Sequence, residues 1–308
     1  MTTPLVSVVT PSYNQAAYIR DSIRSVRRQS HRPVEHIIVD GGSTDGTVEV
    51  LQRAAAESEA EPGYELRFSS GPDEGQSDAI NTGFDRAQGA IVGWLNSDDV
   101  YFDVEVFSRV VDYFDSIDAE VIYGDIAYIN ENSTVQEVNV RPDFSSEILT
   151  YRSTVAQPAA FFDRRVLAEY RLNPEYHYTM DWELWLRLAA EFEFAHVPDV
   201  LAGFRRHEEQ KTVDQEAFES EFQQLRDAYD LPAGREGRNL IDDVLTVEIR
   251  RYIESLRRSY DLHENPRELA FQGLLAPLPT MLAAAGPSRD DVKKSLQRWV
   301  GDAAGQYR

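Results

Sequence analysis

GWLNSDDVY, at residues 93–101, joins the end of an apolar run to two adjacent carboxylates. The run begins at Ala90, and its length and composition are typical of a buried strand. It ends in Asn96, Ser97, Asp98 and Asp99, after which the chain becomes apolar again. Adjacent carboxylates repel each other. Their position at the mouth of a core strand therefore indicates that something there compensates their charge.

Strands and helices alternate in the chain that leads up to this stretch. β-Branched or apolar runs predict strands at 6–10, 37–39 and 64–69. Ser43-Thr44-Asp45 supplies N-cap chemistry for a helix that ends near Ser58. Apolar residues recur at helical spacing in 15–29 and 76–87. This alternation predicts an α/β protein with a mostly parallel sheet flanked by helices.

The pattern loosens after residue 103. Helical spacing recurs at 104–115 and 181–190, and the segments 126–129 and 134–140 flank a turn and predict a hairpin. Further strands are expected at 121–123, 159–162 and 200–206. Beyond about residue 215 the sequence is helical and charge-rich, with one apolar helical face over 245–260. We therefore expect two domains, residues 1–215 with the sheet and residues 216–308 as a helical C-terminal extension.

The composition excludes several classes of protein. The 308 residues carry a net charge of -22, which disfavours nucleic acid as a partner because a long phosphate backbone requires a basic stripe. Without cysteine, it has no thiolate metal site and no cysteine nucleophile. The first residues, MTTPLVSVVT, lack the basic region of a signal peptide, which predicts a cytoplasmic protein. The acidic, Lys-poor composition suits a halophilic source, and an acidic mesophilic protein is the alternative.

The segment 268–285 is the most apolar part of the predicted extension. Its two prolines and short length exclude a membrane-spanning helix. A packed helical pair is one interpretation. A patch that docks on a membrane or on a second subunit is the alternative, although acidic surroundings weaken attraction to anionic lipid.

Polar residues gather where the predicted parallel strands end. Thr10-Pro11-Ser12-Tyr13 follows the first strand, Asp40 the second, and Asn96 to Asp99 the fourth. Ligands of open α/β sheets bind outside the carboxyl ends of the strands, so we expect these side chains to share one crevice. Two adjacent acids there favour Mg²⁺ or Mn²⁺, which also takes phosphate oxygens. The alternative is simple capping of the helix at 104–115.

Four motifs follow one another in the first hundred residues: VSVVTPSYN from Val6, HIIVDGGSTDGT from His36, GQSDAINTG from Gly75 and WLNSDD from Trp94. In this order they resemble family 2 glycosyltransferases of the GT-A fold, over roughly residues 5–210. The resemblance implies a Rossmann-like sheet, inverting transfer from a nucleoside-diphosphate sugar, Mn²⁺ or Mg²⁺ as cofactor, and Asp98 as metal ligand. It also implies nucleotide-sugar contacts from Thr10, Pro11, Ser12, Tyr13, Asp40, Gly42, Gln76, Asp78, Asn81, Asn96, Ser97 and Asp99.

The chain departs from the family pattern at two positions. Asn96 stands where the first acid of the usual Asp-X-Asp signature is found, and its amide can bond a ribose hydroxyl or order a metal-bound water. Met180 precedes Asp181 where the family has a Glu-Asp pair. The resemblance implies that Asp181 is the general base that takes the proton of the acceptor hydroxyl. A helix cap ahead of Trp182 is the alternative role, and both are compatible.

His207 follows the last predicted strand, where the family often has a histidine near the metal or diphosphate. A neutral imidazole there is a plausible metal ligand. The alternatives are an exposed histidine, or a phosphate contact made by Arg205 or Arg206 instead. Trp182 and Trp185 are candidates for stacking on an acceptor sugar, with a core position as the alternative for at least one.

We weigh three functions. The first is transfer of a sugar to an acceptor hydroxyl in the synthesis of cell-surface polysaccharide or of glycoprotein or glycolipid glycans, with UDP-sugars favoured because most relatives that the chain resembles use them. Its partners are the donor and a glycan or lipid-linked acceptor, with peripheral contact to the inner membrane face or a homo-oligomer through the extension. The second is a catalytically silent nucleotide-sugar binder, suggested by Asn96 and Met180. The third, a nucleotidyltransferase, is disfavoured because no Gly- and Arg/Lys-rich phosphate loop follows the first strand.

Overall fold

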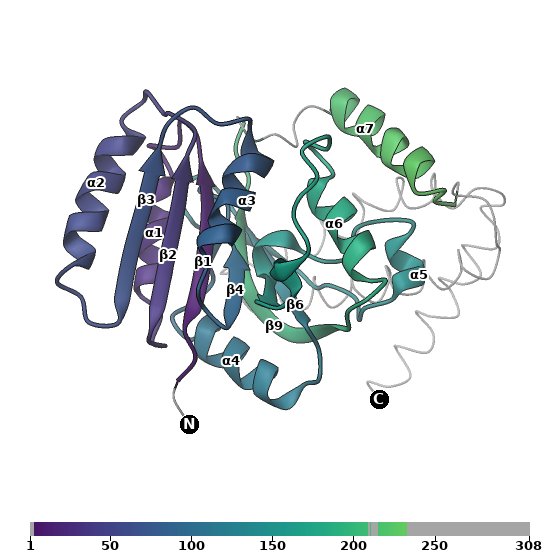
Figure 1. The fold of residues 1–308 in the computed structure, drawn as a ribbon, viewed down its shortest axis with the longest axis horizontal. Helices are drawn as coiled ribbons and strands as arrows, with labels where there is room; N and C mark the ends of the chain where they lie inside the picture. Colours follow the sequence, from purple (N-terminus) through teal and green to yellow (C-terminus); the bar gives the residue numbers. More distant parts are fainter. Residues whose placement is uncertain (1–2, 209, 211–214, 233–308) are drawn as a thin grey trace, which may run out of the picture. The chain divides into compact units, whose positions relative to one another are not determined.

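Nine strands form one sheet among the residues that the computed structural model describes, which are 3–208, 210 and 215–232 (Figure 1). The strand order is β3-β2-β1-β4-β8-β6-β9-β5, and β7 pairs with β6 beside this path. Helices pack on both faces of the sheet. The predicted α/β class is therefore confirmed.

The first four strands along the chain are parallel and form one half of the sheet. The central strand β1 (Val6–Ser12) pairs with β2 (Val34–Asp40) on one side and with β4 (Ile91–Trp94) on the other, and β2 pairs with β3 (Tyr64–Ser70). Three helices connect these strands: α1 (Ile19–Arg27), α2 (Thr47–Ser58) and α3 (Gln76–Arg86). The alternation predicted from the sequence is confirmed, and the carboxyl ends of these strands lie at one edge of the sheet.

The other half of the sheet is mixed. Strand β8 (Ala160–Asp163) is antiparallel to β4 and to β6 (Val121–Ile129), whereas β9 (Phe194–Arg205) runs parallel to β6. The predicted hairpin is confirmed as β6 with β7 (Val135–Asn139). The prediction of separate strands at 121–123 and 126–129 is wrong, because one strand covers both.

A further strand, β5 (Val100–Tyr101), was not expected from the sequence. It pairs antiparallel to β9, with Val100 opposite Gly203. Its partner lies about a hundred residues away in the chain, and such a short strand has no hydrophobic period of its own. Pairing to β9 alone makes this segment a strand.

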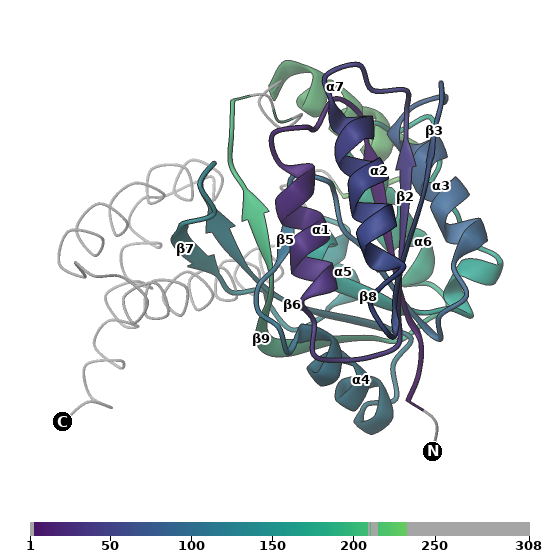
Figure 2. The ribbon, with the colours of Figure 1, turned by 90° about the vertical axis from the view of Figure 1, so that its left-hand side faces the viewer.

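The two faces of the sheet carry separate hydrophobic clusters because successive strand residues point to opposite sides. Val8 and Ile38 pack toward α1, α2 and α4 (Val106–Ser116). Val9 and Ile37 pack toward α3, α6 (Met180–Leu188) and α7 (Gln215–Ala228). Figure 2 shows α1 and α2 side by side on the first of these faces.

Helix α6 is anchored in the core by its aromatic residues. Trp182 is 3% exposed and Trp185 is fully buried, stacked on Phe162 at 5.5 Å between ring centroids. Both indoles are therefore core residues, and the expectation that one of them stacks on an acceptor sugar is wrong. The short helix α5 (Ser146–Leu149) is capped by Ser145, whose side chain accepts a hydrogen bond from the backbone N–H of Ile148.

Helix α7 packs on the same face. Leu225 is fully buried, and the ring of Phe222 stacks on Trp182 at 4.9 Å. The compact unit that contains the sheet runs from Met1 to Ala233, so α7 belongs to it. The predicted boundary at residue 215 between a sheet domain and a helical extension stays a prediction. The expectations for 245–260 and 268–285 lie outside the described residues. None of the helices described combines the length and apolarity needed to cross a membrane.

Candidate active site

The loop that leaves β4 is organised by the side-chain amide of Asn96. Its Oδ1 accepts from Trp94 Nε1 at 3.0 Å and from Gln76 Nε2 at 3.1 Å, and its Nδ2 donates to Gln157 Oε1 at 3.0 Å. Gln157 Nε2 in turn donates to the carbonyl of Trp94 at 2.6 Å, which fixes the orientation of that amide. Asn96 therefore acts as both acceptor and donor here, which a carboxylate in its place would not do.

The two predicted metal ligands face each other. Asp98 Oδ2 lies 3.0 Å from His207 Nε2, although the residues are 109 positions apart in the chain. The His207 side chain is 2% exposed and packs against the ring of Tyr18 at 4.7 Å between centroids. His207 is thus an inward-facing side chain of this site, and the alternative of an exposed surface histidine is wrong.

Asp99 points into the protein instead. It is 1% exposed, and its Oδ1 accepts the backbone N–H of Arg205 at 2.9 Å. Burial, with the adjacent charge of Asp98, raises the pKa of Asp99 well above its usual value, against the lowering effect of Arg205. This carboxyl joins the loop to β9, and its predicted part in nucleotide-sugar binding stays a prediction.

The structure separates the arginines that the sequence left as alternatives. The guanidinium of Arg205 is fully buried, and its Nε donates to the carbonyl of Asp98 at 2.7 Å. Its Nη1 donates to the carbonyls of Asn130 and Glu131 at 3.0 and 2.9 Å. Arg205 is therefore committed to loop carbonyls. Arg206 lies over the ring of Tyr128, with its Cζ 3.4 Å from the centroid.

At the end of β1, the residues predicted to contact the nucleotide sugar differ in exposure. Thr10 is buried, and its hydroxyl bonds His36 Nε2 at 2.9 Å. Burial lowers the pKa of His36 to about 3, so this imidazole is neutral. Pro11 is buried as well, whereas Tyr13 is 63% exposed. Ser12 is 5% exposed, and its buried hydroxyl has no partner among the described residues, so its predicted contact with the nucleotide sugar stays a prediction.

The carboxylate of Asp40 organises the loop after β2. Its Oδ2 accepts from the backbone N–H groups of Gly42 and Ser43 at 3.1 and 3.0 Å and from Ser70 Oγ at 2.6 Å, while its Oδ1 accepts from Ser43 Oγ. Gly42 adopts φ +86°, a left-handed conformation that favours glycine. The contact of Asp40 with a nucleotide base stays a prediction; the described bonds hold this loop and the end of β3.

Farther along that loop, Asp45 accepts the backbone N–H of Thr47 at 3.0 Å. Its other oxygen accepts the N–H of Ala16 at 2.9 Å. The predicted capping chemistry of Ser43-Thr44-Asp45 therefore comes from its last residue, although Gly46 occupies the N-cap position of α2. The same carboxylate ties the loop after β1 to the loop after β2.

The site residues predicted on α3 contact different parts of the protein. Gln76 reaches the β4 loop through Asn96, as described above. Asp78 is half-buried, and its Oδ2 accepts the backbone N–H of Glu74 at 3.2 Å. Asn81 exchanges two hydrogen bonds of 2.9 Å with the backbone of Leu172. Asn81 therefore holds the segment that leads toward α6, and Ser97, at 5% exposure, is buried in the β4 loop.

Asp181 is the second residue of α6 and is partly buried. Burial raises the pKa of its carboxyl to about 6; the Trp182 backbone N–H, which Oδ1 accepts at 2.8 Å, and the charge of Arg141 act in the opposite direction. Asp181 thus contributes a capping bond and has the raised pKa that general bases show. Met180 Sδ lies 3.3 Å from Ser77 Oγ, which brings this end of α6 against α3.

Sequence reasoning missed Glu221 on α7. One oxygen of its carboxylate accepts from the N–H groups of Tyr178 and Thr179 at 2.7 Å and from Thr179 Oγ1 at 2.9 Å, and the other accepts from the N–H of His177 at 2.8 Å. Burial raises its pKa, but these backbone amides more than offset that effect and hold the pKa below its usual value. Glu221 therefore fixes the segment immediately before Asp181.

A signal for Glu221 exists in the sequence. It shares one face of α7 with Phe218, Phe222 and Leu225, at helical spacing. A charged residue on an otherwise apolar face requires hydrogen-bond partners inside the protein. Gln157 carries no comparable signal, because its partners in the β4 loop lie some sixty residues away.

The described residues fit a divalent cation that is held partly by the protein and partly by a bound diphosphate. Asp98 offers a carboxylate oxygen and His207 an imidazole nitrogen, both of which Mn²⁺ accepts, and Mg²⁺ favours the oxygen. Nowhere in the described ranges do three or more such side chains cluster closely enough to hold a metal alone. A cation at this pair would therefore complete its coordination with water and phosphate oxygens.

Comparison with known proteins gives two named sequence relatives. The chain is 47% identical over 96 residues to "Putative teichuronic acid biosynthesis glycosyltransferase TuaG" of Bacillus subtilis, covering 31% of this chain and 36% of that protein. It is 27% identical over 191 residues to "PGL/p-HBAD biosynthesis glycosyltransferase" of Mycobacterium bovis, covering 61% of this chain and 70% of that protein. The first match therefore spans little more than a third of the relative.

Two solved structures share the fold. Residues 1–349 of S. aureus TarS in complex with UDP-GlcNAc give a TM-score of 0.59 at 16% identity, covering 91% of this chain and 81% of that one. Mannosyltransferase PcManGT of Pyrobaculum calidifontis, with GDP-Man and Mn²⁺, gives 0.58 at 17% identity, covering 100% and 82%. The family described as "Glycosyl transferase family 2" matches residues 7–174, more than half of the chain. The chain therefore belongs to glycosyl transferase family 2.

Proposed function

We propose that the protein is an inverting glycosyltransferase that moves one sugar from a nucleoside-diphosphate sugar to an acceptor hydroxyl. The observation that carries the proposal is the approach of Asp98 to His207 at 3.0 Å at the end of β4. A carboxylate and an imidazole held together there suit a cation bound to a diphosphate. Contacts between Gln76 and Asn96 and between Ser77 and Met180 connect this loop to the helix that carries Asp181.

Asp181 supplies the base in this proposal. Its carboxylate takes the proton of the acceptor hydroxyl as that oxygen attacks the anomeric carbon, and the bond from this carbon to the diphosphate oxygen breaks. A single displacement of this kind inverts the anomeric centre, and it requires one base and no covalent intermediate. When bound at Asp98 and His207, Mn²⁺ or Mg²⁺ supplies positive charge that stabilises the leaving diphosphate.

A UDP-sugar is the favoured donor. TarS, which shares the fold, was crystallised with UDP-GlcNAc, and PcManGT with GDP-Man, so both bases enter the test. The acceptor is proposed to be a glycan or lipid-linked glycan of cell-surface polysaccharide, glycoprotein or glycolipid synthesis, in line with relatives named for teichuronic acid and PGL/p-HBAD biosynthesis. The proposed location is the cytoplasm, with peripheral contact at the inner membrane face through residues 216–308.

The test is a turnover assay of the full chain with Mn²⁺ and UDP-, GDP- and dTDP-sugars. We expect one donor class to be consumed, with release of its nucleoside diphosphate. NMR of the product should show that the anomeric configuration of the transferred sugar is inverted relative to the donor. Retained configuration would contradict the inverting mechanism. Tight nucleotide binding without turnover of any donor would favour the silent binder, for which the uncharged Asn96 is the supporting observation. The variant Asp181→Asn is the inactive control.

A further inference from the structure

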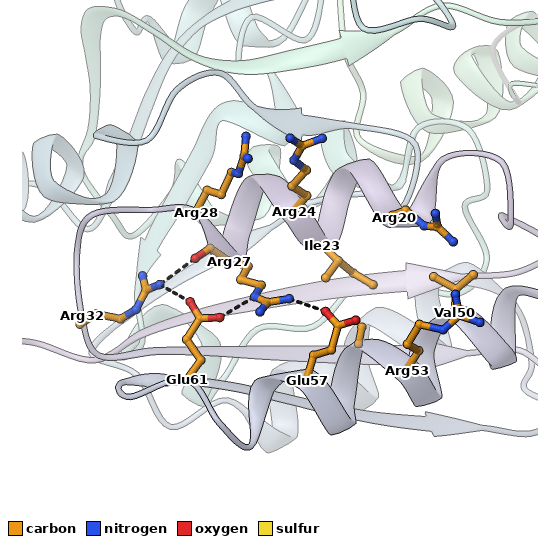
Figure 3. A pocket seen from close by; sticks show the side chains of 11 residues that line it. Arg20, Ile23, Arg24, Arg27, Arg28, Arg32, Val50, Arg53, Glu57 and Glu61 are labelled. Atoms are coloured by element: carbon orange, nitrogen blue, oxygen red, sulfur yellow. Dashed lines mark hydrogen bonds and ion pairs between the residues drawn. The ribbon is translucent and has the colours of Figure 1, made fainter.

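A groove with a volume of about 770 Å³ lies between α1 and α2 (Figure 3). Six arginines line it, together with two acids, Glu57 and Glu61. Figure 3 shows Arg32 at one end of the groove and Arg20 with Arg53 at the other. The arginines are Arg20, Arg24, Arg27, Arg28, Arg32 and Arg53.

Only part of this positive charge is neutralised. Arg27 bonds both Glu57 and Glu61, and Arg32 bonds Glu61 at 3.0 Å. Within the described part of the chain, the other four arginines have no acidic partner within ion-pair distance, and all four are exposed. The whole chain has 53 acidic and 31 basic residues, so a random sample of its charges would be mostly acidic. In the groove, by contrast, basic residues outnumber acidic ones by six to two.

Helix stability does not explain this arrangement. Arg24 and Arg27 lie in the last turn of α1, where the helix dipole favours cations. Arg20 lies in its first turn, where the dipole disfavours them, and Arg53 lies inside α2. Arg20, Arg24 and Arg28 also follow one another at i,i+4 spacing, a destabilising arrangement for like charges. The fold therefore tolerates a cost that a bound anion would relieve.

We propose that this groove is a second ligand site, separate from the donor site, that binds a ligand carrying phosphate groups. Guanidinium groups bind phosphate through paired hydrogen bonds, and six of the residues that line the groove are arginines. The four guanidinium groups without an acidic partner among the described residues match the charge of about two phosphate groups, each of which carries about −1.5 to −2. The phosphates of a lipid headgroup and those of a soluble ligand share this chemistry.

The position of the groove distinguishes it from the proposed active site. Its walls are α1 and α2, which cover one face of the sheet, whereas Asp181 lies in the first turn of α6 on the opposite face. Asp98 and His207 are not among its lining residues. The inference therefore does not rest on the glycosyltransferase mechanism.

The test measures binding of pyrophosphate to the full chain by calorimetry in EDTA, at the lowest salt concentration that keeps the protein folded. The double variant Arg20→Gln/Arg53→Gln removes one cation from each wall, and Arg164→Gln/Arg165→Gln is the matched control because both arginines are exposed outside the groove. We expect the first pair to weaken binding by about tenfold or more, since hydrogen bonds to charged groups are lost. The control should bind like the unmodified chain.

Vesicles of phosphatidylcholine with and without phosphatidylglycerol distinguish the sources of phosphate. If the unmodified chain sediments with anionic vesicles, the groove variant does not, and pyrophosphate does not bind, the ligand is a lipid headgroup. If pyrophosphate binds and the chain does not sediment with the vesicles, the ligand is soluble. The ligand-free groove variant should melt at an equal or higher temperature because repulsion is relieved. Binding unchanged by Arg20→Gln/Arg53→Gln, or no binding of either probe, would overturn the proposal.

Discussion

The parallel and the mixed halves of the sheet hold their carboxylates in different ways. In the parallel half, Asp40 accepts hydrogen bonds from Gly42, Ser43 and Ser70, all within the loops next to it or on the neighbouring strand. On α6, which connects two strands of the mixed half, Asp181 accepts one from the backbone N–H of Trp182, and burial raises its pKa to about 6. A carboxylate with occupied oxygens positions a loop, whereas one with free capacity and a raised pKa can take a proton.

The largest expected effect sharpens this contrast at Asp181. Asp181→Asn keeps the bond to the Trp182 N–H but cannot accept a proton, so we expect kcat to fall by about 10²–10⁴-fold. Nucleotide affinity and melting should show an intact fold. Near-normal turnover in this variant, together with lost stability in Asp181→Ala, would leave the carboxylate with a capping role only.

At the end of β4, Asp98→Ala should lower activity by about 10²–10³-fold, since it removes a ligand of the cation that stabilises the diphosphate. Titration of UDP with and without Mn²⁺ provides the second measurement. We expect Mn²⁺ to tighten UDP binding to the unmodified chain and to have no effect on the variant. Equal enhancement by Mn²⁺ in both proteins would remove Asp98 from the metal site.

Glu221→Gln tests whether α7 positions the base. The amide group of glutamine would face the N–H of His177 or Tyr178, donor against donor, so the segment before Asp181 should loosen. We expect kcat to fall by about tenfold at unchanged donor KM, a loss of about 1.4 kcal/mol. Exposed Glu219 on the same helix offers the matched control, Glu219→Gln, which should behave like the unmodified chain.

The same variant should also shift the pH profile. Arg141 and Glu221 are the charged groups that act on Asp181 in opposite directions, and the charge of Glu221 raises its pKa. Activity of the unmodified chain should rise with pH through about 6, as the base loses its proton. In Glu221→Gln this rise should move to lower pH. A purely structural defect would lower the profile without moving it.

Asn96→Asp is expected to act mainly on stability. A carboxylate would face Gln157 Oε1, which cannot turn away without breaking the bond from its Nε2 to the Trp94 carbonyl. An unsatisfied buried polar group costs about 1–3 kcal/mol. Chemical denaturation should therefore give a lower midpoint than that of the unmodified chain. An unchanged midpoint would mean that Asn96 simply replaces the usual acid.

A smaller effect concerns stability and pH at Asp181. Its pKa in the folded state, about 6, lies above the ordinary value of 3.8, so the folded state binds the proton more tightly. Stability from this group is present at pH below both values and is lost as pH rises through about 6. The effect of Asp181→Asn on the free energy of unfolding, relative to the unmodified chain, should therefore be more favourable at pH 8 than at pH 4 by about 1–2 kcal/mol. Melting curves at the two pH values provide the measurement, with Asp78→Asn as control.

Much of the parallel half could be predicted from the sequence because its information is local. Strand and helix periods identify β1 to β4 and α1 to α3, and each donor motif directly follows its strand. Asp98 and His207 were both predicted for the metal, and the structure places them 3.0 Å apart. The charge of a residue and its place after a strand are readable without coordinates.

Contacts between distant segments required the tertiary structure. β5 exists through its pairing with β9, Gln157 through its bonds to the β4 loop, and Glu221 through bonds to a segment some forty residues earlier. The role of Arg205 could not be read either, because a charged residue in a strand is identical in sequence whether it meets phosphate or backbone carbonyls. The sequence determined the elements and the chemical groups at their ends. Folding determined which groups are satisfied and which remain free to act, since hydrogen bonding and desolvation depend on neighbours in space rather than in the chain.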